Sequence, residues 1–82
     1  MQKHISIVED EAIIRANYSD ALTRQGYAVS SYAARLEAIA AFKIKLPDLA
    51  IIDIGLGEEI DGGFTLCREL RGMSASLPII FL

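Results

Sequence analysis

Short β-type runs alternate with helical segments along the whole chain, and this alternation limits the folds open to it. The runs with strand character are 3–8, 27–32, 48–53 and 77–82. The segments with helical character are 11–25, 33–45 and 63–71. Strands that alternate regularly with helices favour a parallel sheet covered by helices. We therefore expect an α/β doubly wound parallel sheet, built as one domain by the 82 residues.

Local patterns support these elements. The run before Asp53 is apolar at every position, which is typical of a strand covered on both faces. Gly26 stands where a helix ends, and Pro47 stops the second helix. Apolar spacing gives each predicted helix a face toward the core. The members of these faces are Ile14, Tyr18, Ala21 and Leu22; Ala34, Ala38, Ala41 and Phe42; and Phe64, Leu66, Cys67 and Leu70.

Charge and composition exclude several classes of protein. The net charge is −3 and the basic residues are spread along the chain, which argues against nucleic-acid binding by this segment. No apolar run reaches the roughly 18–20 residues that span a bilayer, and the N-terminus lacks the layout of a signal peptide. We expect a cytoplasmic protein with no membrane contact. The single cysteine, Cys67, excludes an internal disulfide and is expected in the core.

Acidic residues end two of the predicted strands. Glu9 and Asp10 follow the first strand, and Asp53 ends the third. The carboxyl ends of parallel strands share one edge of the sheet, so neighbouring strands would bring these three carboxylates together. Their mutual repulsion would be relieved by a divalent cation, and Mg²⁺ prefers such oxygen ligands. An aspartate such as Asp53 can also act as a nucleophile toward phosphorus.

Simpler interpretations exist for each acid alone. Asp10 could cap the following helix, and Asp53 could be a turn residue. Glu9 and Glu11 could be ordinary acids at the positive end of that helix. The glycine-rich loop is expected to be solvated, with Glu58 and Glu59 in solvent and Asp61 as a helix cap. His4 is expected to be a surface imidazole.

Four stretches taken together resemble a known family. "ISIVEDEAIIR", "PDLAIIDIGL", "DGGFTLCRELR" and "LPIIFL" are similar, in this order, to the receiver domain of two-component response regulators. The resemblance covers residues 1–82 as the first two-thirds of such a domain. It implies a flavodoxin-like sheet with strand order 2-1-3-4, lacking the last strand and helices.

The resemblance also implies roles for individual residues. Asp53 would be the phospho-acceptor, and Glu9 and Asp10 the acidic pair, with Asp10 the more direct Mg²⁺ ligand. Gly55 would offer its backbone carbonyl to the metal. A sensor histidine kinase would donate the phosphoryl group, and a downstream output, such as transcription regulation, would respond. The domain would catalyse only its own phosphorylation and would not be a metabolic enzyme.

The chain departs from the family pattern in its loop and in its length. Gly57 stands where the family usually has proline, and the spacing from Asp53 to Asp61 is one residue longer than expected. The family's switch Ser/Thr and its lysine would lie beyond Leu82. Without the fifth strand, the edge of the fourth strand would be free, and we expect self-association through that edge.

Two other functions compete with phosphoryl acceptance. A pseudo-receiver would bind proteins without being phosphorylated, which the intact set of Glu9, Asp10 and Asp53 disfavours. Phosphatases with an aspartyl nucleophile usually carry a second acid two residues later. That position is Gly55 here, which disfavours this class.

Overall fold

The computed structural model describes residues 2–56 and 61–82 and contains the predicted order of strands and helices. The strands are β1 (His4–Val8), β2 (Ala28–Tyr32), β3 (Leu49–Ile52) and β4 (Ile79–Phe81). The helices are α1 (Ala12–Arg24), α2 (Arg35–Ile44) and α3 (Gly62–Met73). The predicted strands are each longer than those observed, by one to three residues.

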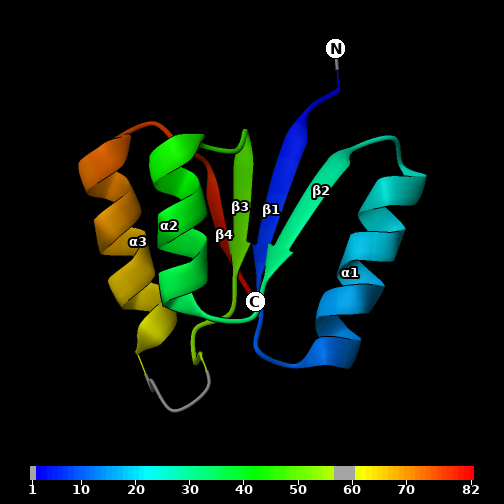
Figure 1. Ribbon diagram of the computed structural model, residues 1–82, viewed down its shortest axis with the longest axis horizontal. Coiled ribbons are helices and arrows are strands. Elements are labelled where there is room, and N and C mark those ends of the chain that lie inside the picture. The colour runs from blue at the N-terminus through cyan, green and yellow to red at the C-terminus, as the bar shows by residue number, and fades with distance from the viewer. Residues whose placement is uncertain (1, 57–60) are drawn as a thin grey trace.

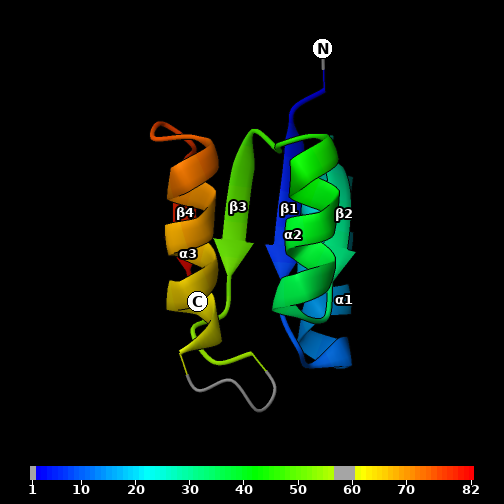
Figure 2. The ribbon, with the colours of Figure 1, turned by 60° about the vertical axis from the view of Figure 1, so that its left-hand side comes forward.

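The strands form one parallel sheet in the order β2-β1-β3-β4. β1 is central, and Ile7 lies between Ser31 of β2 and Ile51 of β3. All strands run in the same direction, α1 covers one face, and α2 and α3 cover the other (Figures 1 and 2). This flavodoxin-like arrangement confirms the fold and strand order predicted from the sequence. In the described residues, no helix is long and apolar enough to cross a bilayer.

The continuous apolar run of β3 serves both faces of the sheet. Ala50 and Ile52 are fully buried in the cluster against α2 and α3, while Ile51 belongs to the cluster on the α1 side. The larger cluster includes Leu66 and Leu70 of α3, both with no exposed surface. Such a strand cannot alternate polar and apolar residues, because neither face meets water.

The prediction that the apolar face of α1 packs into the core is wrong. No residue of α1 is buried, and Ile14 and Tyr18 remain 38% and 39% exposed. Ala21 is exposed as well, and only Leu22 packs against the small cluster of Ile5, Ile7 and Ile51. Helical spacing marks which side chains share a face, but burial requires something to cover that face.

The predicted core faces of α2 and α3 need smaller corrections. Ala34 has an extended backbone, with φ −143° and ψ 155°, so it precedes the helix and does not belong to its apolar face. Ala34 is exposed, and Ile39 is buried instead. In α3, Phe64 is 45% exposed and Cys67 is half-buried. Phe64 packs its ring against Phe81 of β4, with centroids 5.1 Å apart.

Several helix ends follow the sequence signals. Gly26 has φ 95°, and its N–H donates to the Thr23 carbonyl, as expected for a glycine that ends a helix. The N-cap of α1 is Glu11, without a side-chain hydrogen bond, so the alternative of Asp10 as the cap is wrong. Asp61 is at the N-cap of α3, again without a side-chain bond. Asp10 is therefore not needed to start the helix.

His4 was expected at the surface, but it is half-buried. Its Nε2 lies 2.8 Å from the Ser30 hydroxyl, and its backbone N–H donates to an Asp48 carboxylate oxygen at 2.7 Å. The sequence pattern did not show this because the neighbouring strand supplies Ser30. His4 and Asp48 lie at the amino ends of β1 and β3, away from Glu9, Asp10 and Asp53.

Candidate metal centre

Strand hydrogen bonds fix the backbone of two of the three acids. The N–H of Glu9 donates to the Tyr32 carbonyl of β2 at 3.0 Å. The N–H of Asp53 donates to the Val8 carbonyl of β1 at 2.9 Å. Both acids therefore continue the strand pairing just past the ends of β1 and β3, and their position along the sheet is set by the register.

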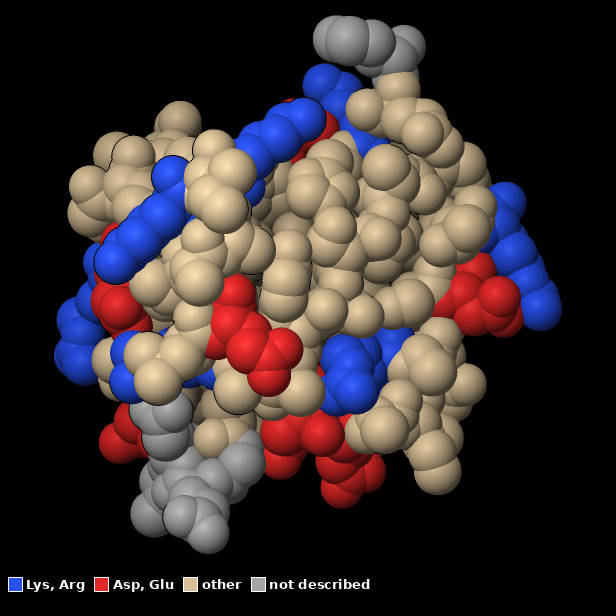
Figure 3. All heavy atoms as spheres, in the orientation of Figure 1, with Lys and Arg blue, Asp and Glu red and all other residues tan. Residues whose placement is uncertain are grey.

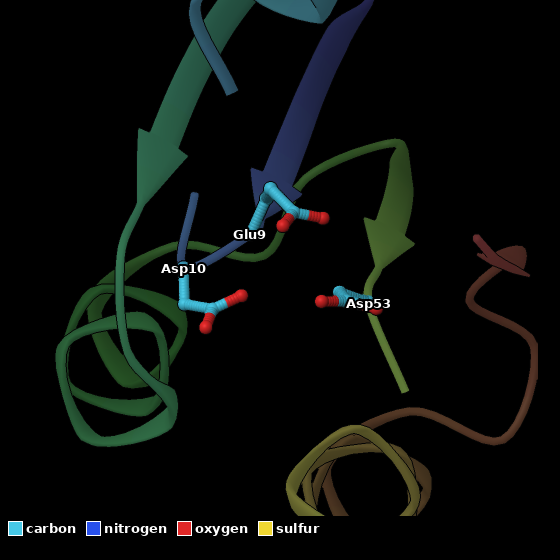
Figure 4. Close-up of side chains that lie close together, drawn as sticks. All are labelled: Glu9, Asp10 and Asp53. Carbon is cyan, nitrogen blue, oxygen red and sulfur yellow. The ribbon is translucent and has the colours of Figure 1, made fainter. Parts of the chain in front are cut away.

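The structure brings together the three acids predicted from the sequence. Each of Glu9, Asp10 and Asp53 offers a carboxylate oxygen, and these oxygens all lie within 4.8 Å of one another. Figure 4 shows the three side chains around one gap, from the ends of β1 and β3 and the loop that follows β1. Glu9 is buried, Asp53 is half-buried and Asp10 is exposed. The predicted convergence of β1 and β3 is thus confirmed.

The position of Glu9 disfavours the charged form of its carboxyl group. Burial raises the pKa of its carboxyl above the ordinary value of 4.5, because the charged form loses hydration. The Glu11 N–H donates to Glu9 Oε1 at 3.2 Å and opposes this rise in the pKa. The neighbouring carboxylates of Asp53 and Asp10 reinforce it. The site therefore favours whatever can neutralise its negative charge.

A pocket of about 410 Å³ opens above the acids. Its lining residues are Glu9, Asp10, Glu11, Ile14, Tyr18, Asp53, Gly55 and Leu82. On the face seen in Figure 3, acidic side chains gather at the lower end, where Figure 1 shows the strands finishing. Gly55 thus lies beside the acids, as its predicted role requires. Gly57, Glu58 and Glu59 lie outside the described residues.

The donor set fits a hard divalent cation. Three carboxylates within 4.8 Å supply only oxygen ligands, and one of them is buried. Mg²⁺ binds one or two carboxylates directly, keeps several waters and takes phosphate oxygens. Glu9, Asp10 and Asp53 would hold such an ion, either directly or through water.

Sequence reasoning missed the close packing of Gly63 against the backbone of Asp53. A Cβ added at this position would lie 2.2 Å from the Asp53 carbonyl oxygen and 2.7 Å from Ile54 Cα. The Gly63 N–H donates to the Ile54 carbonyl at 2.7 Å. The start of α3 therefore approaches the backbone of the candidate phospho-acceptor more closely than any side chain would allow. The paired glycines at 62 and 63 were the available signal.

Arg15 was also missed. Its guanidinium Nη1 donates to the Glu9 carbonyl at 2.8 Å and lies 3.5 Å from the Asp10 carbonyl. No sequence motif marks a side chain that binds backbone carbonyls, because any residue offers a carbonyl.

The fold and the acids define a class of protein: a doubly wound parallel domain with a carboxylate pocket at the ends of its central strands. The sequence profile described as "Response regulator receiver domain" matches residues 5–82. The chain therefore belongs to the receiver domain family of two-component response regulators.

Curated relatives are transcriptional regulators. The chain is 37% identical over 81 residues to the transcriptional regulatory protein CseB of Streptomyces avermitilis, covering 99% of this chain and 33% of that protein. It is 34% identical over 76 residues to CreB of Escherichia coli, covering 93% of this chain and 32% of that protein. The chain thus spans about a third of the length of these relatives.

Solved structures agree with the fold. The N-terminal domain of a response regulator/sensory box/GGDEF three-domain protein from Carboxydothermus hydrogenoformans superposes with a TM-score of 0.88. It is 31% identical, and the match covers 96% of this chain and 62% of that chain.

Proposed function

We propose that Asp53 accepts a phosphoryl group in a Mg²⁺-dependent reaction and that this modification switches a downstream output. The observation that carries the proposal is the placement of Asp53 with Glu9 and Asp10, their oxygens within 4.8 Å. Relatives named as transcriptional regulators support transcription as the process controlled by the full-length protein. A sensor histidine kinase is the proposed donor, and we propose the cytoplasm as the location of this chain.

Asp53 would act as the nucleophile. One of its carboxylate oxygens attacks phosphorus, the O–P bond forms, and the bond from phosphorus to the donor's imidazole nitrogen breaks. Mg²⁺, when bound by Glu9, Asp10, Asp53 and the proposed Gly55 carbonyl, would neutralise negative charge on the transferring group. The hydrogen bond from Asp53 N–H to Val8 holds the nucleophile in register.

Phosphorylation can be tested with a small-molecule phosphodonor. We expect intact-mass spectrometry to show one added phosphoryl group in Mg²⁺, and none in EDTA or in Asp53→Asn. Asp20→Asn is the matched control, because Asp20 is exposed on α1 and pairs only locally with Arg24 at 2.9 Å. It should be modified like the wild type. No added mass in wild type with Mg²⁺ would favour a pseudo-receiver that binds proteins without phosphorylation.

We further propose that the chain associates with a second copy through β4. This strand is at the end of the sheet and pairs with β3 on one side. Ile80, Phe81 and Leu82 are 50%, 37% and 39% exposed, and none of the residues of β4 is charged. Edges without charges are templates for strand pairing.

A further inference from the structure

Arg15 binds the loop that carries two of the three acids. Its side chain donates to the Glu9 carbonyl at 2.8 Å and approaches the Asp10 carbonyl at 3.5 Å. Its own backbone N–H donates to the Glu11 carbonyl at 2.9 Å, at the first turn of α1. One residue thus contacts three consecutive carbonyls, those of Glu9, Asp10 and Glu11.

These contacts connect the end of β1 to the start of α1. The N–H of Glu9 is held by β2, but Asp10 follows β1 and reaches the pocket from the loop. Arg15 is half-buried, and its hydrogen bonds to carbonyls on this loop restrict the backbone rotations that aim the Glu9 and Asp10 side chains. Side chains that orient metal ligands are as much part of a metal site as the ligands.

The location of Arg15 is electrostatically unfavourable for a positive charge. It is the fourth residue of α1, close to the positive end of the helix dipole, where a cation is disfavoured. It also brings a positive charge to the backbone of a site suited to a cation. A Coulombic effect alone would therefore make Arg15 weaken Mg²⁺ binding.

We infer that Arg15 is a positioning residue, which holds the Glu9–Asp10 loop in the geometry that binds the divalent cation. This inference rests on the proposed function of the acidic pocket. It predicts that removing Arg15 weakens Mg²⁺ binding, although a positive charge is lost. A purely electrostatic role predicts the opposite sign, so the two are separated by one measurement.

The test titrates the full chain with MgCl₂ and follows backbone amide NMR shifts. Arg15→Met keeps the aliphatic stem and loses the donors, and we expect its Mg²⁺ dissociation constant to rise about tenfold. Arg15→Lys keeps the charge with different donor geometry and should recover part of the loss. The matched control is Arg24→Met, which removes a charge from the same helix at a side chain 77% exposed. It should bind Mg²⁺ as the wild type does.

A second readout is independent of the metal. In metal-free protein, we expect the amides of Asp10 and Glu11 to exchange hydrogen faster in Arg15→Met than in wild type, while the β1 amides stay unchanged. Equal exchange in both proteins, or tighter Mg²⁺ binding by Arg15→Met, overturns the inference. Wild type that shows no Mg²⁺-dependent shifts overturns the proposed metal site, while the exchange readout still decides the role of Arg15.

Discussion

Glu9 couples the stability of the domain to pH. Burial raises the pKa of its carboxyl, so the folded state binds a proton more tightly than the unfolded chain. Above the ordinary value of 4.5, the folded state holds more protons, and the free energy of unfolding falls as pH rises through the folded pKa. We expect Glu9→Gln to be more stable than wild type at pH 7 and to show a flatter pH profile. Urea unfolding in EDTA measures both.

Glu11→Gln is the control for this prediction. Glu11 is an exposed neighbour, so the substitution should change the free energy of unfolding by no more than about 0.5 kcal/mol. Adding Mg²⁺ should restore stability to wild type at pH 7, because a ligand that binds only the folded state stabilises it. Parallel pH profiles for wild type and Glu9→Gln would show that the charge of Glu9 is not costly.

The same residues show why the acidic pocket was predictable and its supports were not. Glu9, Asp10 and Asp53 stand at strand ends, and parallel topology alone places such ends on one edge. Arg15 acts on backbone carbonyls, which have no sequence signature. The hydrogen bond of His4 to Ser30 depends on the register of β1 with β2, which hydrophobic patterns do not specify for polar side chains.

At the scale of elements, the start of α3 can lie close to the end of β3 only because residue 63 has no side chain. We expect Gly63→Ala to push α3 away from Asp53 and to destabilise the domain by about 1–3 kcal/mol, because the new Cβ meets backbone atoms. The displacement should also slow phosphorylation of Asp53. Thermal unfolding and the phosphodonor assay measure the two effects.

Gly72, near the other end of α3, provides a matched control. A Cβ there meets nothing within 4 Å, so Gly72→Ala should stabilise the helix by up to about 1 kcal/mol and leave phosphorylation unchanged. If both alanine variants behave alike, α3 does not rely on close contact with the Asp53 backbone.

The predicted burial was right for Leu66 and Leu70 of α3 and wrong for the apolar face of α1, for one physical reason. Leu66 and Leu70 face a sheet surface that α3 covers, so their spacing translates into complete burial. Ile14 and Tyr18 have the same kind of spacing, but they line the open pocket beside the acids. Periodicity determines which side chains share a face of a helix, while the element that packs against this face determines whether they are buried.

At the scale of the whole molecule, a second copy could pair with either edge strand of the sheet. β2 and β4 are its edge strands, and neither contains a charged residue. The centre of the face in Figure 3, over β2, is likewise free of charged side chains. The two edges differ in what they expose: the exposed residue of β2 is the polar Ser31, whereas β4 exposes the apolar Ile80 and Phe81. Association should therefore favour β4, where pairing also buries apolar surface.

Ile80→Lys tests this association through β4. Ile80 is 50% exposed, so the charge should cost the single copy little, whereas two facing lysines would repel in an isologous strand pair. We expect light scattering to show mass that rises with concentration in wild type and stays monomeric in Ile80→Lys. Ile44→Lys, at an 88% exposed position on α2, removes an apolar side chain elsewhere and should associate like wild type. A wild-type mass that stays monomeric at every concentration contradicts the proposal, and loss of association in both variants points to general hydrophobicity instead of β4.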